Sequence, residues 1–160
     1  MIIRVLNHKT RNVMPTVKRI NETGHKSMVF TDRSDYYLKR NKNRYIGVNT
    51  NTFNATTSHK ENEDWVVLIH DDVEISDTLF DDIEHILQFA PLDYPVSFFN
   101  PNNNLYNNHE DGHVIKSRTN FWMPCNAFPK EYITKFWEWV DENVIEYGVD
   151  AEDYLMQKYN

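Results

Sequence analysis

The chain has 160 residues, a formal net charge of -7 and a single cysteine, Cys125, so no disulfide can form within it. This length predicts one domain spanning residues 1–160, and the lone cysteine fits a reducing compartment. The acidic charge argues against a dedicated nucleic-acid binder, and no apolar run approaches the roughly 20 residues of a membrane span, so we expect a cytoplasmic protein without membrane contact.

The first half of the chain predicts a strand–helix–strand unit followed by a loop. Strands are predicted at residues 2–6, 27–30 and 45–48, from short runs of β-branched and other apolar side chains. A helix is predicted after the first strand, because Val13, Val17 and Ile20 recur at helical spacing and Gly24 is a suitable stop. The stretch 49–64 is polar and rich in Asn and Thr, which is typical of a mobile loop.

The second half of the chain contains the strongest strand signal. Trp65–Ile69 is apolar on both faces, as a central parallel strand is, and it ends at His70-Asp71-Asp72. A helix with an apolar face follows it, with Ser76 or Asp77 as the expected N-cap. The other predicted elements are a strand at 96–99, an extended segment at 113–122, a helix that Pro129 opens and Gly148 ends, and a short helix at 151–159.

This alternation of strands and helices predicts an α/β fold with a mostly parallel sheet and helices on both faces. Ligands of such sheets bind beyond the carboxyl ends of the strands. The rule brings three polar segments to one edge of the predicted sheet, namely Asn7–Asn12, Asp32–Asp35 and His70–Asp72.

Asp71 and Asp72 form an acidic pair at the exit of the most apolar strand. Two adjacent carboxylates repel each other, and a divalent cation relieves the repulsion. Mg²⁺ and Mn²⁺ prefer carboxylate oxygens and bind through one or two of them together with substrate phosphates. The alternative is that the pair caps the following loop or helix through backbone N–H groups, and spacing alone leaves both interpretations open.

The segment Trp65-Val66-Val67-Leu68-Ile69-His70-Asp71-Asp72 resembles the strand and DxD-type motif of glycosyltransferases with the GT-A fold. The resemblance implies a single GT-A-like (Rossmann-like) domain, in which the acidic motif holds Mn²⁺ or Mg²⁺ on the diphosphate of a nucleotide-sugar. It assigns Asp72 to the metal, and Asp71 to the metal or to the ribose or sugar. His70 stands where the usual motif has its first acid, either as a replacement ligand or as a packed side chain.

A second segment, Met123–Glu131, is similar to the small-residue segment with Asn that precedes a helix in the same family. The resemblance implies that Asn126 contacts the donor. Glycines are usual in this segment, whereas Pro124 and Cys125 stand here.

A third segment, Gly148–Leu155, resembles the Glu-Asp motif of inverting members of the family. The resemblance implies that Asp153, with Glu152 beside it, is the general base for the acceptor hydroxyl. The alternative is that both acids stabilise the N-terminus of a helix. Many relatives also use a later histidine as a metal ligand. Here His109, His113 or water would take that place, or the metal would be absent.

The residues after the first two strands complete the expected donor pocket. Asn7, Thr10 and Arg11 follow the first strand, where the GT-A fold begins its nucleotide site, and Arg11 is expected to reach the diphosphate. The alternative for this segment is a solvated loop. Asp32 ends the second strand, where the family often reads the base with an acid.

The resemblance therefore implies an inverting transfer of a sugar from a nucleotide-sugar to a hydroxyl acceptor, with a UDP-sugar as the first choice of donor. The acceptor is a small molecule, a glycan or a modified DNA base, and the Asn- and Lys-rich chain is compatible with a viral enzyme of the host cytoplasm. The alternative, motivated by His70, is a non-catalytic nucleotide- or sugar-binding module with a degenerate site. A metal-dependent phosphoesterase is a third interpretation, which needs more ligands than the sequence places.

Overall fold

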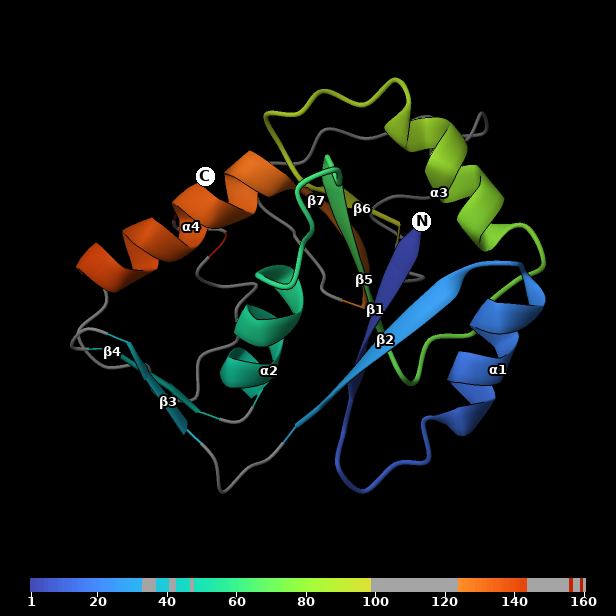
Figure 1. Cartoon of the computed structure of the whole chain (residues 1–160), viewed down its shortest axis with the longest axis horizontal. Coiled ribbons are helices and arrows are strands. Elements are labelled where there is room, and N and C mark those ends of the chain that lie inside the picture. Colours follow the sequence, from blue (N-terminus) through green and yellow to red (C-terminus); the bar gives the residue numbers. More distant parts are fainter. Residues whose placement is uncertain are drawn as a thin grey trace, which may run out of the picture.

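The computed structural model describes residues 1–32, 37–40, 43–46, 48–98, 124–143, 156 and 159, and Figure 1 shows their arrangement. In chain order the elements are β1 (Ile2–Asn7), α1 (Met14–Glu22), β2 (Lys26–Thr31), β3 (Tyr37–Arg40), β4 (Asn43–Ile46), α2 (Val48–Thr56), β5 (Trp65–His70), α3 (Leu79–Leu87), β6 (Val96–Ser97), β7 (Cys125–Pro129) and α4 (Lys130–Asn143). None of the helices in these ranges combines the length and the apolar character needed to cross a membrane.

Five strands form one open sheet in the order β2-β1-β5-β7-β6. β1 pairs in parallel with both β2 and β5, and Val5 of β1 lies opposite Ile69 of β5. β7 runs antiparallel to its neighbours β5 and β6, so the sheet that the sequence predicts as mostly parallel is a mixed sheet with one reversed strand. β3 and β4 form a separate antiparallel pair.

Helices cover both faces of the five-stranded sheet, as the sequence predicts (Figure 1). On one face, Leu6 and Leu68 pack with residues of α2 and α4. On the other face, Val5 and Ile69 pack with residues of α1 and α3. Alternate residues of β1 and β5 thus supply two separate cores, which is why Trp65–Ile69 is an almost continuous apolar run.

The strand order reverses between β1 and β5. The first connection runs from β1 through α1 outward to β2, and a later one returns through α2 past β1 to β5. α1 and α2 lie on opposite faces of the sheet (Figure 1). In open α/β sheets, ligands bind outside the carboxyl ends of the strands at such a reversal.

The Asn- and Thr-rich stretch that composition assigns to a loop contains the helix α2, so that prediction is wrong for residues 49–56. Two of its polar side chains form hydrogen bonds with other elements of the fold. Asn51 Nδ2 donates to the carbonyl of Phe30 at 2.7 Å. Thr56 Oγ1 accepts a hydrogen bond from the buried indole of Trp137 at 2.9 Å. Tertiary partners therefore satisfy groups that in isolation favour turns.

The strand β7 is absent from the sequence prediction, and other elements differ from it at their ends. Pro129 ends β7 instead of opening the helix, which begins at Lys130. The N-cap of α3 is Thr78, so the prediction of Ser76 or Asp77 is wrong, and Thr78 makes no side-chain cap hydrogen bond. Gly24, with φ of 80°, follows α1 as predicted, in a conformation that glycine adopts readily. The predicted segment 113–122 lies outside the described residues, as does most of 151–159.

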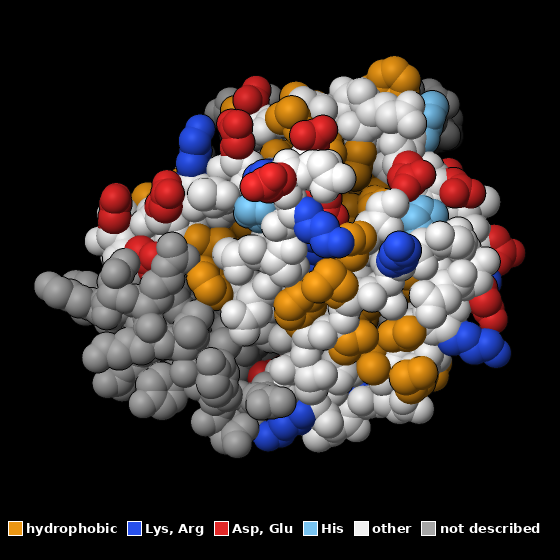
Figure 2. All heavy atoms as spheres, viewed as in Figure 1, with side chains coloured by type: hydrophobic (Ala, Val, Ile, Leu, Met, Phe, Trp, Pro, Cys, Tyr) orange, Lys and Arg blue, Asp and Glu red, His pale blue; other side chains and the backbone are white. Residues whose placement is uncertain are grey.

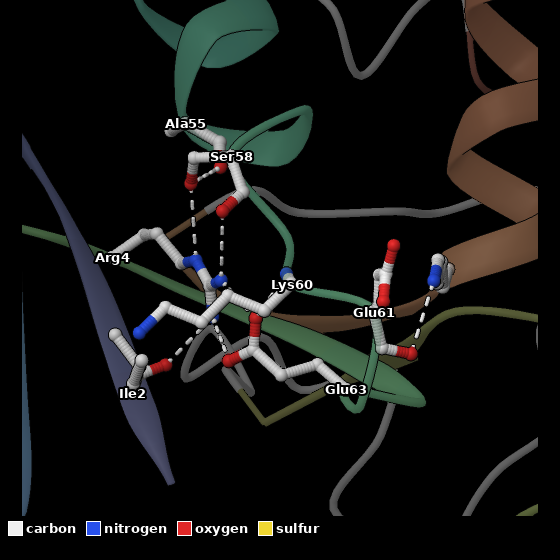
Figure 3. Close-up of polar contacts among 8 residues, drawn as sticks. Ile2, Arg4, Ala55, Ser58, Lys60, Glu61 and Glu63 are labelled. Carbon is white, nitrogen blue, oxygen red and sulfur yellow. Dashed lines mark hydrogen bonds and ion pairs between the residues drawn. The ribbon is translucent and has the colours of Figure 1, made fainter.

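Arg4 is a charged residue inside the buried strand β1, and its side chain is fully buried. Its guanidinium donates to both carboxylate oxygens of Glu63, at 3.0 and 2.6 Å (Figure 3). It also donates to the hydroxyl and the carbonyl of Ser58 and to the carbonyl of Ile2. This network satisfies the buried cation and ties the loop between α2 and β5 to β1.

Candidate functional site

The carboxyl ends of β1, β2 and β5 lie at one edge of the sheet, as the sequence predicts. The backbone N–H of Asp32 donates to the carbonyl of Asn7 at 2.8 Å, which joins the end of β2 to the end of β1. The backbone N–H of Asp71 donates to the carbonyl of Leu6 at 3.0 Å, which joins the end of β5 to the same strand. The three loops that follow these strands therefore start side by side, across the reversal of strand order.

Asp71 is the inner member of the acidic pair, and its side chain is 3% exposed. Its Oδ1 accepts a hydrogen bond from Arg11 Nη1 at 2.8 Å, and its Oδ2 accepts the backbone N–H of His8 at 3.0 Å. Its carbonyl accepts a hydrogen bond from the hydroxyl of Thr16 at 3.1 Å. Asp71 is thus a buried carboxylate with both oxygens in use, and it fixes the β1–α1 loop against the end of β5.

Asp72 is the outer member of the pair, and its side chain is 53% exposed. Arg11 Nη1 lies 2.7 Å from Asp72 Oδ2, so a single guanidinium bridges both carboxylates. Hydrogen bonds to Asp71 and then to Asp72 raise the pKa of Arg11 above its ordinary value. The guanidinium stays charged and offsets the repulsion between the two acids.

Two buried acceptors lie at the ends of β1 and β2. Asn7 and Asp32 are each 6% exposed. Asn7 Nδ2 donates to Thr31 Oγ1 at 3.3 Å, whereas Asn7 Oδ1 and Asp32 Oδ1 have no hydrogen-bond partner among the described residues. A buried acceptor without a donor costs free energy, so these oxygens suit the hydroxyl or N–H groups of a ligand.

His70 ends β5, and its Nε2 is buried without a hydrogen-bond partner in the described part of the chain. Burial lowers the pKa of His70, and the nearby carboxylates of Asp72 and Asp71 oppose this effect only in part. The imidazole is therefore neutral at pH 7. Its two predicted roles, as a replacement ligand or as a packed side chain, both stay predictions.

The remaining predicted site residues lie apart from this cluster or outside the described residues. Thr10 is exposed in the β1–α1 loop, with its Oγ1 2.8 Å from His8 Nδ1. Asn126 is fully buried on β7 opposite Leu68, inside the sheet and not at its edge. The residues that lie outside the described ranges are Glu152, Asp153, His109 and His113.

The residues present fit a divalent ion that is held by one carboxylate and shared with a ligand. Asp72 offers an exposed carboxylate, whereas both oxygens of Asp71 already accept hydrogen bonds. Within the described ranges, no three His, Cys, Asp or Glu side chains are grouped to hold a metal. Mg²⁺ commonly keeps several waters and binds through one or two carboxylates plus substrate phosphates. The edge therefore suits an ion that a phosphate-bearing ligand shares.

Sequence reasoning missed two supports of the site, the backbone N–H of His8 and the hydroxyl of Thr16. Thr16 is a single threonine near the start of a helix, a pattern that carries no signal of its own. The pairing of Arg11 with the acids was also missed. A basic residue just after one strand and acids just after its parallel neighbour are the signal that points to it.

Comparisons with protein families, with curated proteins and with solved structures find no match to this chain. The fold and the site define an α/β protein with a mixed, open five-stranded sheet of a general Rossmann-like kind, with a charged cluster at its carboxyl edge.

Proposed function

We propose that this protein is a metal-dependent glycosyltransferase that moves a sugar from a nucleotide-sugar to an acceptor hydroxyl. A UDP-sugar is the first choice of donor. One observation carries the proposal: Asp71, Asp72 and Arg11 meet at the carboxyl ends of β5 and β1, where the strand order reverses. This is the position at which open α/β sheets bind nucleotides. The likeness of Trp65–Asp72 to the DxD-type motif supports the same function.

Each charged or polar group at this edge has a role in such a transfer. Asp72 provides the carboxylate for Mn²⁺ or Mg²⁺, which when bound neutralises charge on the leaving diphosphate. Arg11 provides a second positive charge and N–H donors for phosphate oxygens. Asn7 and Asp32 offer acceptor oxygens to the hydroxyl or N–H groups of the nucleoside.

The base of the proposed reaction is Asp153, with Glu152 beside it. The carboxylate takes the proton of the acceptor hydroxyl as its oxygen attacks the anomeric carbon, so the transfer inverts the configuration. This part of the proposal comes from the likeness of Gly148–Leu155 to the Glu-Asp motif of inverting transferases.

The surface charge bears on the choice of acceptor. Acidic side chains gather along the margins of the face in Figure 2, over α4 on one side and near α3 on the other. The described acids of α3 and α4 include Asp81, Asp82, Glu131, Glu138 and Glu142. Such margins repel a phosphate backbone, so a hydroxyl of a small molecule or a glycan is the first choice of acceptor and a modified DNA base is the second.

A screen of nucleotide-sugars tests the donor half of the proposal. We expect one UDP-sugar to be hydrolysed slowly in Mn²⁺ and not after chelation of the metal. Asp153→Asn should then abolish transfer with an unchanged circular dichroism spectrum, whereas the matched variant Asp141→Asn should retain activity. Full activity of Asp153→Asn would remove the assignment of the base.

A non-catalytic nucleotide- or sugar-binding module is the second candidate, and the full use of both Asp71 oxygens by the protein favours it. Calorimetric titration with UDP, with and without Mn²⁺, separates the candidates. Metal-dependent binding together with turnover of a donor supports the transferase. Binding without turnover of any donor supports the module. No binding of any nucleoside diphosphate would remove the transferase and the nucleotide-binding form of the module.

A further inference from the structure

Arg11 occupies the place of a cation between two carboxylates. Its Nη1 lies 2.8 Å from Asp71 Oδ1 and 2.7 Å from Asp72 Oδ2. The bridge crosses from the β1–α1 loop to the end of β5, which are 60 residues apart in the chain. The guanidinium thus performs in the free protein the neutralisation that a divalent ion performs in a metal site.

The two halves of this bridge differ in how firmly they are held. Asp71 is almost fully buried, and the His8 N–H holds its second oxygen, so it is a fixed anchor. Asp72 is half exposed, and Arg11 is its one ion-pair partner among the described residues. An ion pair between two half-exposed side chains contributes little to stability. The contact of Arg11 with Asp72 is therefore the half that is easily released.

We infer that Arg11 is a built-in counter-ion of the acidic pair, which leaves Asp72 when a metal-bound diphosphate arrives and then binds the phosphate. This inference rests on the proposed function, because it takes a nucleoside diphosphate as the ligand. A divalent ion on Asp72 and a guanidinium on the same carboxylate repel each other. A diphosphate attracts both cations, so it offers Arg11 a new partner at the moment the ion displaces it.

The exchange has a consequence that can be measured. The free ion competes with Arg11, so metal alone binds weakly. Diphosphate relieves the competition, so metal and diphosphate each strengthen the binding of the other by the same factor. Loss of the Arg11 charge then has opposite effects on two ligands: Mn²⁺ alone binds more tightly, and UDP in the presence of Mn²⁺ binds more weakly.

Titration calorimetry on Arg11→Gln tests this prediction, with Mn²⁺ alone and with UDP in saturating Mn²⁺ as the probes. Loss of the competing exposed ion pair should tighten Mn²⁺ binding about fivefold. Loss of a charge-assisted hydrogen bond should weaken UDP binding about tenfold. Arg19→Gln is the matched control, because Arg19 lies on α1 and pairs with Asp77, away from the acidic pair. It should leave both affinities unchanged.

Several results would overturn the inference. If Arg11→Gln leaves the Mn²⁺ affinity unchanged or lowers it, Arg11 does not compete with the ion, and the same holds if neither protein binds Mn²⁺ measurably. A purely structural role for Arg11 would lower both affinities together. If the wild type binds no nucleoside diphosphate, the proposed function fails, while the titration with Mn²⁺ alone still decides whether Arg11 is a counter-ion.

A second variant covers the case in which Arg11→Gln does not fold. Arg11→Lys keeps the charge but replaces the planar donor group that bridges two acids with a point charge. We expect the same two opposite changes with smaller factors, and a fall in both affinities or no change in either would overturn the inference here too.

Discussion

The Oδ2 of Asp71 accepts the backbone N–H of His8 at 3.0 Å, across the boundary between β5 and β1. This hydrogen bond separates the roles of two neighbouring acids. Asp71 holds the β1–α1 loop in place, and Asp72 is left with an exposed carboxylate that a ligand can reach. Changes at the two residues should therefore affect different properties of the protein.

Asp72→Asn should abolish metal-dependent turnover of the donor without unfolding the protein. The loss should be at least about 100-fold, since even residues that only support a metal ligand cost about 10- to 100-fold. The measurement is donor hydrolysis across a Mn²⁺ titration, with circular dichroism as the check on folding. Asp77→Asn, which removes an exposed acid a few residues away, is the control and should keep full activity. Wild-type turnover by Asp72→Asn would exclude Asp72 as the metal-binding residue.

Asp71→Ala should lower the free energy of unfolding by about 2 kcal/mol, because it leaves the His8 N–H without its acceptor and removes one of the two carboxylates that the Arg11 guanidinium bridges. Asp72→Ala removes the same charge from an exposed position and should change stability little. Urea denaturation monitored by tryptophan fluorescence measures both variants. Equal stabilities of the two variants would contradict the division of roles between these acids.

Much of the fold could be predicted because Trp65–Ile69 is apolar on both faces. In the first strand–helix–strand unit, polar loop residues and Gly24 also mark where the elements end. β7 could not be predicted, since Cys125–Pro129 is a short strand that contains a buried Asn and ends in Pro, a composition that resembles a loop before a helix. α2 was missed because its Asn and Thr side chains find partners on other elements, such as the carbonyl of Phe30. Contacts distant in sequence decided both cases.

The site could be predicted as a list of residues at one edge, but not as a set of contacts. The register of β1 on β5 sets Leu6 opposite His70, which brings Asn7 and Asp71 to the same level. With this register the loop after β1 reaches the acids after β5. A sequence pattern gives the ends of strands, whereas the distance between their side chains depends on pairing and register.

Arg4→Met should destabilise the protein by about 3–5 kcal/mol, because it leaves Glu63, whose side chain is 15% exposed, without its cation. The double variant Arg4→Met/Glu63→Leu should recover most of this loss, since apolar residues of similar volume often replace a buried ion pair at little cost. Urea denaturation of the wild type, both single variants and the double variant gives the four unfolding free energies of a double-mutant cycle. Additive losses would mean that the two side chains are not coupled.

Cys125 should be unreactive in the native protein. It is 2% exposed at the start of β7, and burial raises the pKa of its thiol to about 12. Since the thiolate is the reactive form, labelling by a disulfide reagent near pH 8 should be at least about 100-fold slower in the folded than in the urea-unfolded protein. As the chain has one cysteine, the rate reports on β7 alone. Rapid labelling of the native protein would show that β7 opens to solvent.

Glu63 links stability to acid pH. Burial raises its pKa, but hydrogen bonds from Arg4 and from the backbone N–H of Lys60 outweigh burial, so its pKa in the folded protein lies below the ordinary 4.5. The unfolded chain then binds the proton more readily. The carboxylate thus contributes stability that is complete above pH 4.5 and is lost as pH falls through the folded pKa.

The urea midpoint should therefore fall more steeply between about pH 6 and about pH 3 in the wild type than in Glu63→Gln, which has no proton to bind at this position. Parallel pH profiles of the two proteins would mean that Glu63 is equally easy to protonate in the folded and unfolded states.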